Sequence, residues 1–449
     1  MTSKRTEELV EYDREHVLHA QIPLGENLGY VYDSADGIYL WDSEGKKYID
    51  ASSQMVSCNL GHGRREIIEA AQRQLDKLQH VGQYYGHSST PMVECAMKLS
   101  EITPGDLDHF WFTSGGGEAT DAAIRLARRF YSATGQPTKQ KVVSLYMSYH
   151  GVANGPMNMT GIPAMRAGYG PEAPGYLHIP AYYCYRCPFG LDYPACDVRC
   201  ARFLETVILS EGPENVAAFI AEPELGASGF LVPPNEYWPL IREICTKYDV
   251  VMIADEVMSG FCRTGRMFCI DHWDVVPDLM AMSKGITSGY LPFGAVAIGD
   301  KVWDGLQGVE LMHQYTFSGA PASCAAAIAA IDVYVKENVA QNAERVGKHV
   351  VERIEAEFMS MPCVGTHSGL GLMLAMEIVA DKKTKAMFDP PVGPIMPVLE
   401  EARQNGLHLR QMGSNRIVIA PPCTTTIEEA DRIVDIIKPL VAAIRPPAL

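Results

Sequence analysis

Lys284 is the residue of this sequence best placed for covalent chemistry with a carbonyl compound. It follows the apolar run PDLMAMS and precedes GITSG, a loop of small residues. A lysine in such a partly desolvated place has a lowered pKa, and its neutral amine attacks carbonyl carbons. A lysine on the surface is the plainer alternative. The hypothesis therefore depends on partners elsewhere in the chain.

Two acidic residues, Asp255 and Glu256, end a second apolar run, VVMIADE. The run predicts a buried parallel strand. Ligands of open α/β sheets bind at the carboxyl ends of strands, and a carboxylate buried there needs a partner. Asp255 is therefore a candidate partner for a cationic ligand atom. An acid that only caps the next turn is the alternative.

Two further segments could bind the phosphate and the ring of a cofactor. In FTSGGGEATDAAIRLARRFY, Gly116 and Gly117 precede a helical run, and amides at such a helix start can bind an anion. Tyr149 and His150 follow KVVSLYMS, where an aromatic ring could lie flat on a planar ligand. Each segment alone has a structural alternative, a connector or a core aromatic. Together with the lysine and the acid, they form the set that a pyridoxal-phosphate (PLP) site requires.

The pattern of strands and helices predicts an α/β fold that could hold these residues together. Four runs, KVVSLY, VAAFIAEP, VVMIADE and FGAVAIG, suit buried parallel strands, and helical patterns alternate with them from residue 63 onward. GIYLWDSEGKKYIDASS predicts a β-hairpin. A long helix over 334–358, a hairpin near GLGLMLAMEI and a final helix from Thr425 predict an α+β region at the C-terminal end.

The sequence resembles the class III aminotransferases of PLP fold type I, and among them the ω-amino acid and amine:pyruvate group. The similar stretches occur in the family's order from about residue 10 to about residue 440; they are GIYLWDSEGKKYID, SGGGEATDAAIRLARRFY, SYHG, AAFIAEP, ADEV followed by GFCRTG, SKGITSGYLPFGAV, QYTFSGAPASCAAA and IVIAPP. The resemblance implies a large domain with a mostly parallel sheet of the seven-stranded type and a smaller α+β domain formed by both termini. The expected segments are 1–70 and 336–449 for the small domain and 71–335 for the large PLP-binding domain.

The resemblance also implies a role for each candidate residue. Lys284 would bind PLP covalently and later carry a proton, while Asp255 would pair with the pyridine nitrogen and Tyr149 would stack on the ring. The other residues expected to bind the cofactor are His150, beside the ring, Val257, behind it, and Gly116 and Gly117 at the phosphate, with Thr316 added from a neighbouring subunit. A site of that kind implies a homodimer, and the pairing of dimers into a tetramer is left open. No metal is expected in the reaction.

The predicted reaction moves an amino group to pyruvate or a similar 2-oxo acid. The donor would be an ω-amino acid, a diamine or an amine, with taurine, β-alanine and putrescine-like compounds all open. Met55 and Val56 would line the substrate pocket, and Arg410 would bind a carboxylate, with Arg416 as the alternative. Ala227 stands where many relatives carry a glutamate that neutralises this arginine. A decarboxylase, aminomutase or racemase of the same fold is the alternative function.

Composition excludes several other classes of protein. The 449 residues include 38 Lys and Arg against 54 Asp and Glu, a formal charge of −16, which disfavours nucleic acid and anionic membranes as partners. No apolar run is long enough to span a bilayer, and the polar start MTSKRTEELVEYDREHVLH is unlike a signal peptide. We therefore expect a cytoplasmic enzyme with reduced thiols.

Four of the 12 cysteines stand close together in YYCYRCPFGLDYPACDVRC. Cys184, Cys187, Cys196 and Cys200 follow the pattern C-x2-C-x8-C-x3-C. The last two would share one face of a helix that starts within ACDVRCARFLETVIL. Packed or surface thiols are the first expectation, and a structural zinc site or a disulfide is left open. The other eight cysteines are expected to be buried small hydrophobes.

Overall fold

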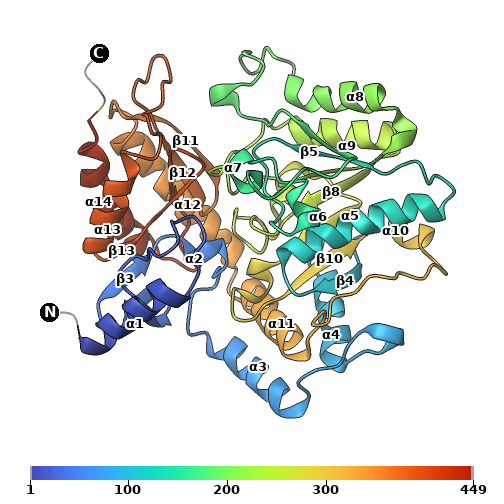
Figure 1. The fold of residues 1–449 in the computed structure, drawn as a ribbon, viewed down its shortest axis with the longest axis horizontal. Helices are drawn as coiled ribbons and strands as arrows, with labels where there is room; N and C mark the ends of the chain where they lie inside the picture. The colour runs from blue at the N-terminus through green and yellow to red at the C-terminus, as the bar shows by residue number, and fades with distance from the viewer. Residues whose placement is uncertain (1–2, 446–449) are drawn as a thin grey trace.

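A seven-stranded sheet forms the centre of the larger part of the molecule (Figure 1). The computed structural model describes residues 3–445. The strand order is β4 (His109–Thr113), β10 (Gly294–Ile298), β9 (Leu279–Met282), β8 (Val251–Asp255), β7 (Val216–Ala221), β5 (Lys141–Leu145) and β6 (Tyr176–Ile179). Strands β9, β8, β7, β5 and β6 run parallel to one another. The predicted mostly parallel sheet is confirmed.

Strand β10 departs from the prediction, because it pairs antiparallel with both β4 and β9. The interpretation of FGAVAIG as a parallel strand was wrong. A parallel neighbour needs a crossover connection of a dozen or more residues, usually containing a helix. Residues 283–293 join β9 to β10 and hold only one short 3₁₀ turn, Lys284–Thr287. The chain therefore turns back beside β9, and this places Lys284 in the turn.

Helices cover both faces of this sheet. Helix α5 (Gly116–Ala133) packs an alanine-rich face against one side, and α8 (Arg199–Glu211) and α9 (Tyr237–Lys247) cover the other. Strand β7 is buried along its whole length: Phe219 packs in the core beneath α9, and Ile220 packs in the core beneath α5. This alternation explains the continuous apolar run of the strand.

The two ends of the chain combine in the smaller part of the molecule (Figure 1). One four-stranded sheet has the order β1 (Tyr32–Asp36), β2 (Tyr39–Asp42), β3 (Lys47–Asp50) and β13 (Leu407–His408); the other has the order β11 (Val364–Leu370), β12 (Met373–Ile378), β15 (Arg416–Ile419) and β14 (Arg410–Met412). Strands β2 and β3 form the predicted hairpin, and β3 pairs in parallel with β13. The domain boundaries at residues 70 and 335 stay a prediction.

The predicted helix over 334–358 is two helices, so that prediction was wrong at its start. Helix α11 (Pro321–Lys336) ends before Asn338, whose φ of 52° is left-handed, and α12 (Val339–Glu357) follows. Asparagine tolerates this conformation better than most residues, which allows the sharp break. The final helix, α14 (Ile427–Ala442), begins after a Thr426 N-cap with a capping box to Glu429, close to its predicted start.

The remaining helices are short or lie at the surface. They are α1 (Lys4–His16), α2 (Ser53–Val56), α3 (Arg65–Lys77), α4 (Thr90–Ser100), α6 (Asn154–Met157), α7 (Pro163–Arg166), α10 (Asp300–Gly305) and α13 (Ile395–Gln404), with further 3₁₀ turns at Tyr84–Gly86, Cys184–Arg186, Pro213–Asn215 and Cys269–Trp273. Within residues 3–445, no helix combines the length and the apolar character needed to cross a membrane.

Candidate active site

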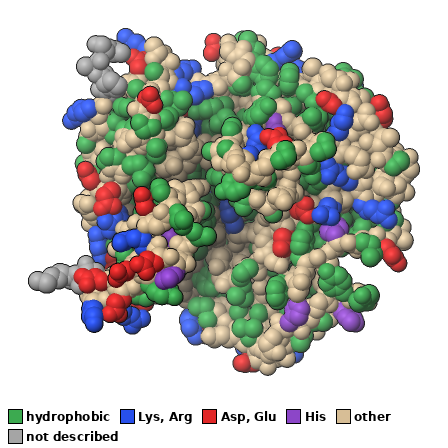
Figure 2. Space-filling view, viewed as in Figure 1, with side chains coloured by type: hydrophobic (Ala, Val, Ile, Leu, Met, Phe, Trp, Pro, Cys, Tyr) green, Lys and Arg blue, Asp and Glu red, His purple; other side chains and the backbone are tan. Residues whose placement is uncertain are grey.

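The predicted site residues gather at one edge of the seven-stranded sheet. Asp255 ends β8, Lys284 follows β9, and Tyr149 lies four residues beyond the end of β5. The carboxyl ends of parallel strands meet at the same edge, which is where ligands of α/β sheets bind. Gly116 opens α5 beyond the corresponding end of β4. The space-filling view shows a hollow between the larger part and the part built from the two chain ends (Figure 2).

Asp255 is buried and accepts two hydrogen bonds. Its Oδ2 lies 2.7 Å from Nδ1 of His150, and its Oδ1 accepts from the backbone amide of Val257 at 3.0 Å. Asp255 and His150 are each 2% exposed. The other ring nitrogen of His150 has no partner among the described residues. The carboxylate is thus held in a fixed direction at the strand end.

Lys284 lies close to two carboxylates and two arginines. Burial lowers the pKa of Lys284 to about 8, although the negative charges of Glu222 and Asp255 act in the opposite direction. The positive charges of Arg410 and Arg263 lower the pKa further. The backbone at Lys284 has a φ of 43°, a conformation that is uncommon for residues other than glycine. Strained backbone of this kind occurs preferentially at functional sites.

The start of α5 offers unpaired backbone amides. The amides of Gly116 and Gly117 donate to no other atom of the described residues. A Cβ atom on Gly116 would lie 2.6 Å from Cγ1 of Val257, so only glycine fits here without a shift. Two free amides, the buried Asp255 and the lysine with a lowered pKa match the phosphate, the ring nitrogen and the aldehyde of PLP. The residues present therefore fit this cofactor.

Glu222 also lies in the candidate site, although it was not among the residues predicted from the sequence. Its carboxylate accepts hydrogen bonds from the backbone amides of Tyr149 at 2.8 Å and Gly226 at 2.9 Å. Burial raises the pKa of Glu222 to about 7, with His150 acting against and Asp255 adding to the shift. Burial likewise raises the pKa of the half-buried Tyr149. The sequence did contain an indication of this residue, because Glu222 follows the apolar run AAFIA in the same way as Asp255 follows VVMIA.

The two candidate arginines differ sharply in their surroundings. Arg416 is 2% exposed and pairs with Glu377 at 2.7 Å, while its other donors go to Gly229 O and the hydroxyls of Ser368 and Tyr183. Arg410 is half-buried and donates to Gln54 O at 2.9 Å and to Met55 Sδ. No carboxylate within residues 3–445 forms an ion pair with Arg410. The geometry favours Arg410 over Arg416 for binding a substrate carboxylate.

The predicted pocket residues Met55 and Val56 lie in a strained segment. Ser53, Gln54 and Val56 have φ angles of 45°, 59° and 55°. The buried Asp50 holds the turn, since its carboxylate accepts from the backbone amide and side chain of Gln54. Met55 is exposed beside Arg410, whereas Val56 is fully buried. The exposed side chain at this wall is therefore methionine, and the role of Val56 stays a prediction.

Thr316 is exposed in the turn that precedes α11. The prediction assigns it to the site of a neighbouring subunit, which stays open to test.

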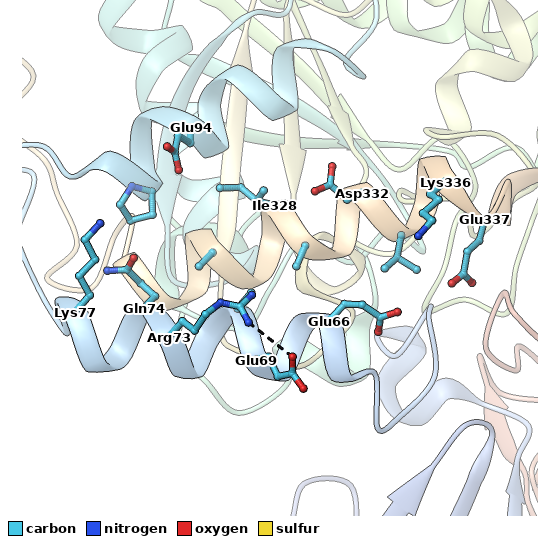
Figure 3. Close-up of a pocket in the computed structure, with 15 residues that line it drawn as sticks. Glu66, Glu69, Arg73, Gln74, Lys77, Glu94, Ile328, Asp332, Lys336 and Glu337 are labelled. Atoms are coloured by element: carbon cyan, nitrogen blue, oxygen red, sulfur yellow. Dashed lines mark ion pairs between the residues drawn. The ribbon is translucent and has the colours of Figure 1, made fainter.

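A separate groove of about 630 Å³ runs between α3 and α11 (Figure 3). Its lining is highly charged and includes Glu66, Glu69, Arg73, Lys77, Asp332 and Lys336. None of the predicted site residues lines it. A groove of mixed charge on the outside of two helices lacks the acid, amine and free amides described above, so it is not the candidate active site.

Comparison with known proteins identifies the class. Residues 23–441 match the family model described as Aminotransferase class-III. The chain is 36% identical over 439 residues to a putrescine–pyruvate aminotransferase of Pseudomonas aeruginosa, covering 97% of this chain and 96% of that protein. This chain belongs to the class III aminotransferase family. It is an enzyme of the transaminase type, and the enzymes of this family depend on PLP.

Solved structures agree with this assignment. The chain superposes on an (S)-enantioselective omega-transaminase from Thermomicrobium roseum with a TM-score of 0.94 and 37% identity, covering 99% of this chain and 100% of that one. An amine transaminase from an uncultivated Pseudomonas species, described as PLP-bound, gives a TM-score of 0.90 and 33% identity over 96% and 98% of the two chains. The predicted fold type I architecture is confirmed.

Arg416→Met should destabilise the protein by about 2–3 kcal/mol, because the buried Glu377 loses a charged hydrogen-bond partner and keeps Arg186 as its remaining ion-pair partner. Burial acts to raise the pKa of Glu377, yet the Arg416 charge keeps it below its usual range. Arg410→Met is the matched control and should cost about 1 kcal/mol or less. Urea unfolding of the PLP-free proteins measures the free energy of unfolding of both variants without a contribution from the cofactor. Equal losses would contradict this assignment of roles.

Proposed function

We propose that this enzyme transfers an amino group from an ω-amino acid, a diamine or a simple amine to pyruvate or a similar 2-oxo acid. The observation that supports the proposal most is the arrangement at the sheet edge, where Lys284 and Asp255 follow adjacent strands and Arg410 lies near the lysine without an acidic partner. The putrescine–pyruvate relative supports both the kind of donor and the acceptor.

Different residues of this chain would bind the different parts of PLP. Lys284 would bind it covalently, and Asp255 would face the ring nitrogen with His150 fixing the carboxylate. Tyr149 and Val257 would pack on the two faces of the ring, and the amides of Gly116 and Gly117 would bind the phosphate. Bound PLP supplies an electron sink that stabilises negative charge on the substrate carbon bearing the amino group.

Lys284 would then act as the acid–base group. A lysine with a pKa near 8 is partly neutral at physiological pH, so its Nζ can remove the proton from the carbon that bears the amino group. The negative charge of Asp255 favours a protonated ring nitrogen. Tyr149, held through its backbone amide by Glu222, would keep the ring from tilting. In the second half of the cycle the same lysine returns a proton to the acceptor's carbon, giving alanine when pyruvate is the acceptor.

A homodimer is part of the proposal. Thr316 stands beside the exposed Met312 and Phe317, which are 89% and 63% exposed. The hydroxyl of Tyr84 donates to Gln314 O at 3.3 Å and brings the exposed Tyr85 (97%) to the same surface. An exposed group of large apolar side chains is typical of an interaction surface. A second copy covering it would bring Thr316 towards the phosphate amides of its neighbour.

PLP-loaded protein mixed with pyruvate and a donor panel should form alanine with at least one donor. Putrescine, β-alanine, taurine and 1-propylamine represent the candidate classes, and alanine is measured by chromatography. Lys284→Ala should reduce turnover to background because both proton transfers are lost. Absence of alanine with every donor, or normal turnover by Lys284→Ala, would refute the proposal. Release of CO2 from a dialkylglycine, with no alanine formed from any of the four amine donors, would favour the decarboxylase alternative.

Arg410→Ala should weaken the half-reaction with pyruvate by about 2–4 kcal/mol, or roughly 30- to 1,000-fold, through loss of a charge-assisted pair. The half-reaction with 1-propylamine should barely change, since this donor has no carboxylate to bind. Stopped-flow absorbance resolves the two half-reactions of one protein, so each serves as the control for the other. Equal losses in both half-reactions would show that Arg410 is structural.

A further inference from the structure

The cysteines of residues 182–200, here called the four-cysteine loop, differ from all the others in the chain. The other eight cysteines are buried, as predicted. In the loop, Cys184 is exposed and Cys187, Cys196 and Cys200 are half-buried. Packing of small apolar side chains therefore explains the eight but not the four. Four cysteines that are not fully buried within 19 residues therefore need an explanation other than core packing.

The loop brings its four thiols around one small void. All four cysteines line a void of about 20 Å³ together with apolar side chains, among them Phe189, Leu191 and Tyr193. That volume accommodates about one water-sized sphere. The site lies outside the predicted active site, since none of the residues assigned to PLP or to substrate lines it. Its size and its donor atoms suit a single ion better than an organic ligand.

Tight turns set the position of each cysteine pair. The amide of Gly190 donates to Cys187 O at 3.0 Å, and Gly190 has a φ of 65°. Asp197 and Val198 have φ angles of 49° and 44°, although valine rarely adopts a positive φ. Helix α8 starts at Arg199, so the prediction that Cys196 and Cys200 share a helix face was wrong. The strained turn instead folds Cys196 back towards the void that Cys200 lines.

We propose that the four-cysteine loop binds one Zn²⁺ ion through four thiolates. Soft sulfur ligands in a tetrahedral arrangement select zinc, and the C-x2-C spacing is common in structural zinc sites. Four thiolates around Zn²⁺ carry a net charge of about −2. Arg199 lines the void and forms no ion pair within residues 3–445, so its charge can balance part of this excess.

Ligation requires the thiols to close in by side-chain rotation. Zn–S bonds of about 2.3 Å place the sulfur atoms of a tetrahedral site about 3.8 Å apart. No three of the loop's sulfur atoms lie within 4.8 Å of one another in the structure. The turns set the backbone of the loop, and all four cysteines line the same void.

The position of the loop indicates what the ion would stabilise. Tyr183 and Arg186 reach the smaller part of the molecule, where both donate to Glu377, with the Arg186 Nε bond at 2.6 Å. From the smaller part, Nζ of Lys385 donates a hydrogen bond of 2.7 Å to Tyr185 O in the loop. These contacts surround the Glu377–Arg416 pair. Zinc in the loop would therefore fix the seam between the two parts of the enzyme.

Metal analysis of the PLP-loaded enzyme, purified without chelators or affinity metals and dialysed, tests the proposal. We expect about one zinc ion per chain. Cys184→Ser and Cys200→Ser should each lower this content at least tenfold, whereas the control Cys363→Ser, a buried cysteine elsewhere, should leave it unchanged. Wild-type protein that neither contains zinc nor binds added Zn²⁺ would overturn the proposal, as would zinc retained at full content by Cys200→Ser.

A second measurement uses only the wild-type enzyme and so does not depend on the folding of a variant. Iodoacetamide labelling followed by peptide mass spectrometry reports the accessibility of each thiol. Bound Zn²⁺ should protect all four cysteines of the loop from labelling together. Removal of zinc by a chelator should increase the labelling rate of each of them at least tenfold. Unchanged labelling with zinc bound, or a disulfide between two of these cysteines in the zinc-treated enzyme, would overturn the proposal.

Discussion

The site depends on burying charge at the edge of the seven-stranded sheet. Asp255 and Glu222 lie at the ends of adjacent strands β8 and β7, and Lys284 lies beyond β9. A buried charge is costly unless it is hydrogen-bonded or paired. His150 and the Val257 amide satisfy Asp255, and backbone amides satisfy Glu222. The loops after β5, β7 and β8 therefore have little freedom, which holds the candidate PLP ligands in place.

A second set of buried polar contacts joins the two parts of the enzyme. The guanidinium of Arg263 is fully buried and donates to Ser53, Asn59 and the carbonyls of Leu372 and Pro421, which come from both ends of the chain. Arg416 also joins the two parts, because it pairs with Glu377 and donates to the hydroxyl of Tyr183 in the four-cysteine loop. The strained segment with Met55 is anchored by these contacts, so the substrate side of the site depends on the seam.

Much of this could be predicted from local sequence. Buried parallel strands have continuous apolar runs, and the candidate residues lie at or shortly after the ends of such runs, so Asp255, Lys284 and Tyr149 could be selected without a structure. The hairpin at β2 and β3 has alternating residues and turn signals, and it was found for that reason. The glycines before α5 were recognisable because a helix start with glycine suits an anion.

The remaining features depend on contacts between distant segments. The direction of β10 follows from the length of its connection to β9, which an apolar run does not reveal. The choice between Arg410 and Arg416 depends on Glu377, a residue more than 30 positions away from either. The break at Asn338 and the turn at Val198 are local conformations that side-chain patterns do not indicate.

In the proposed mechanism the charge of the Asp255 carboxylate makes bound PLP reactive, in addition to holding it. Asp255→Asn nearly preserves the shape and keeps a hydrogen-bonding partner for His150, but it removes the charge. We expect this variant still to bind PLP covalently, which the absorbance of the protein reports, while its half-reaction with the best amine donor slows at least about a hundredfold. A half-reaction within a few-fold of the wild-type rate at full PLP content would contradict this role of Asp255.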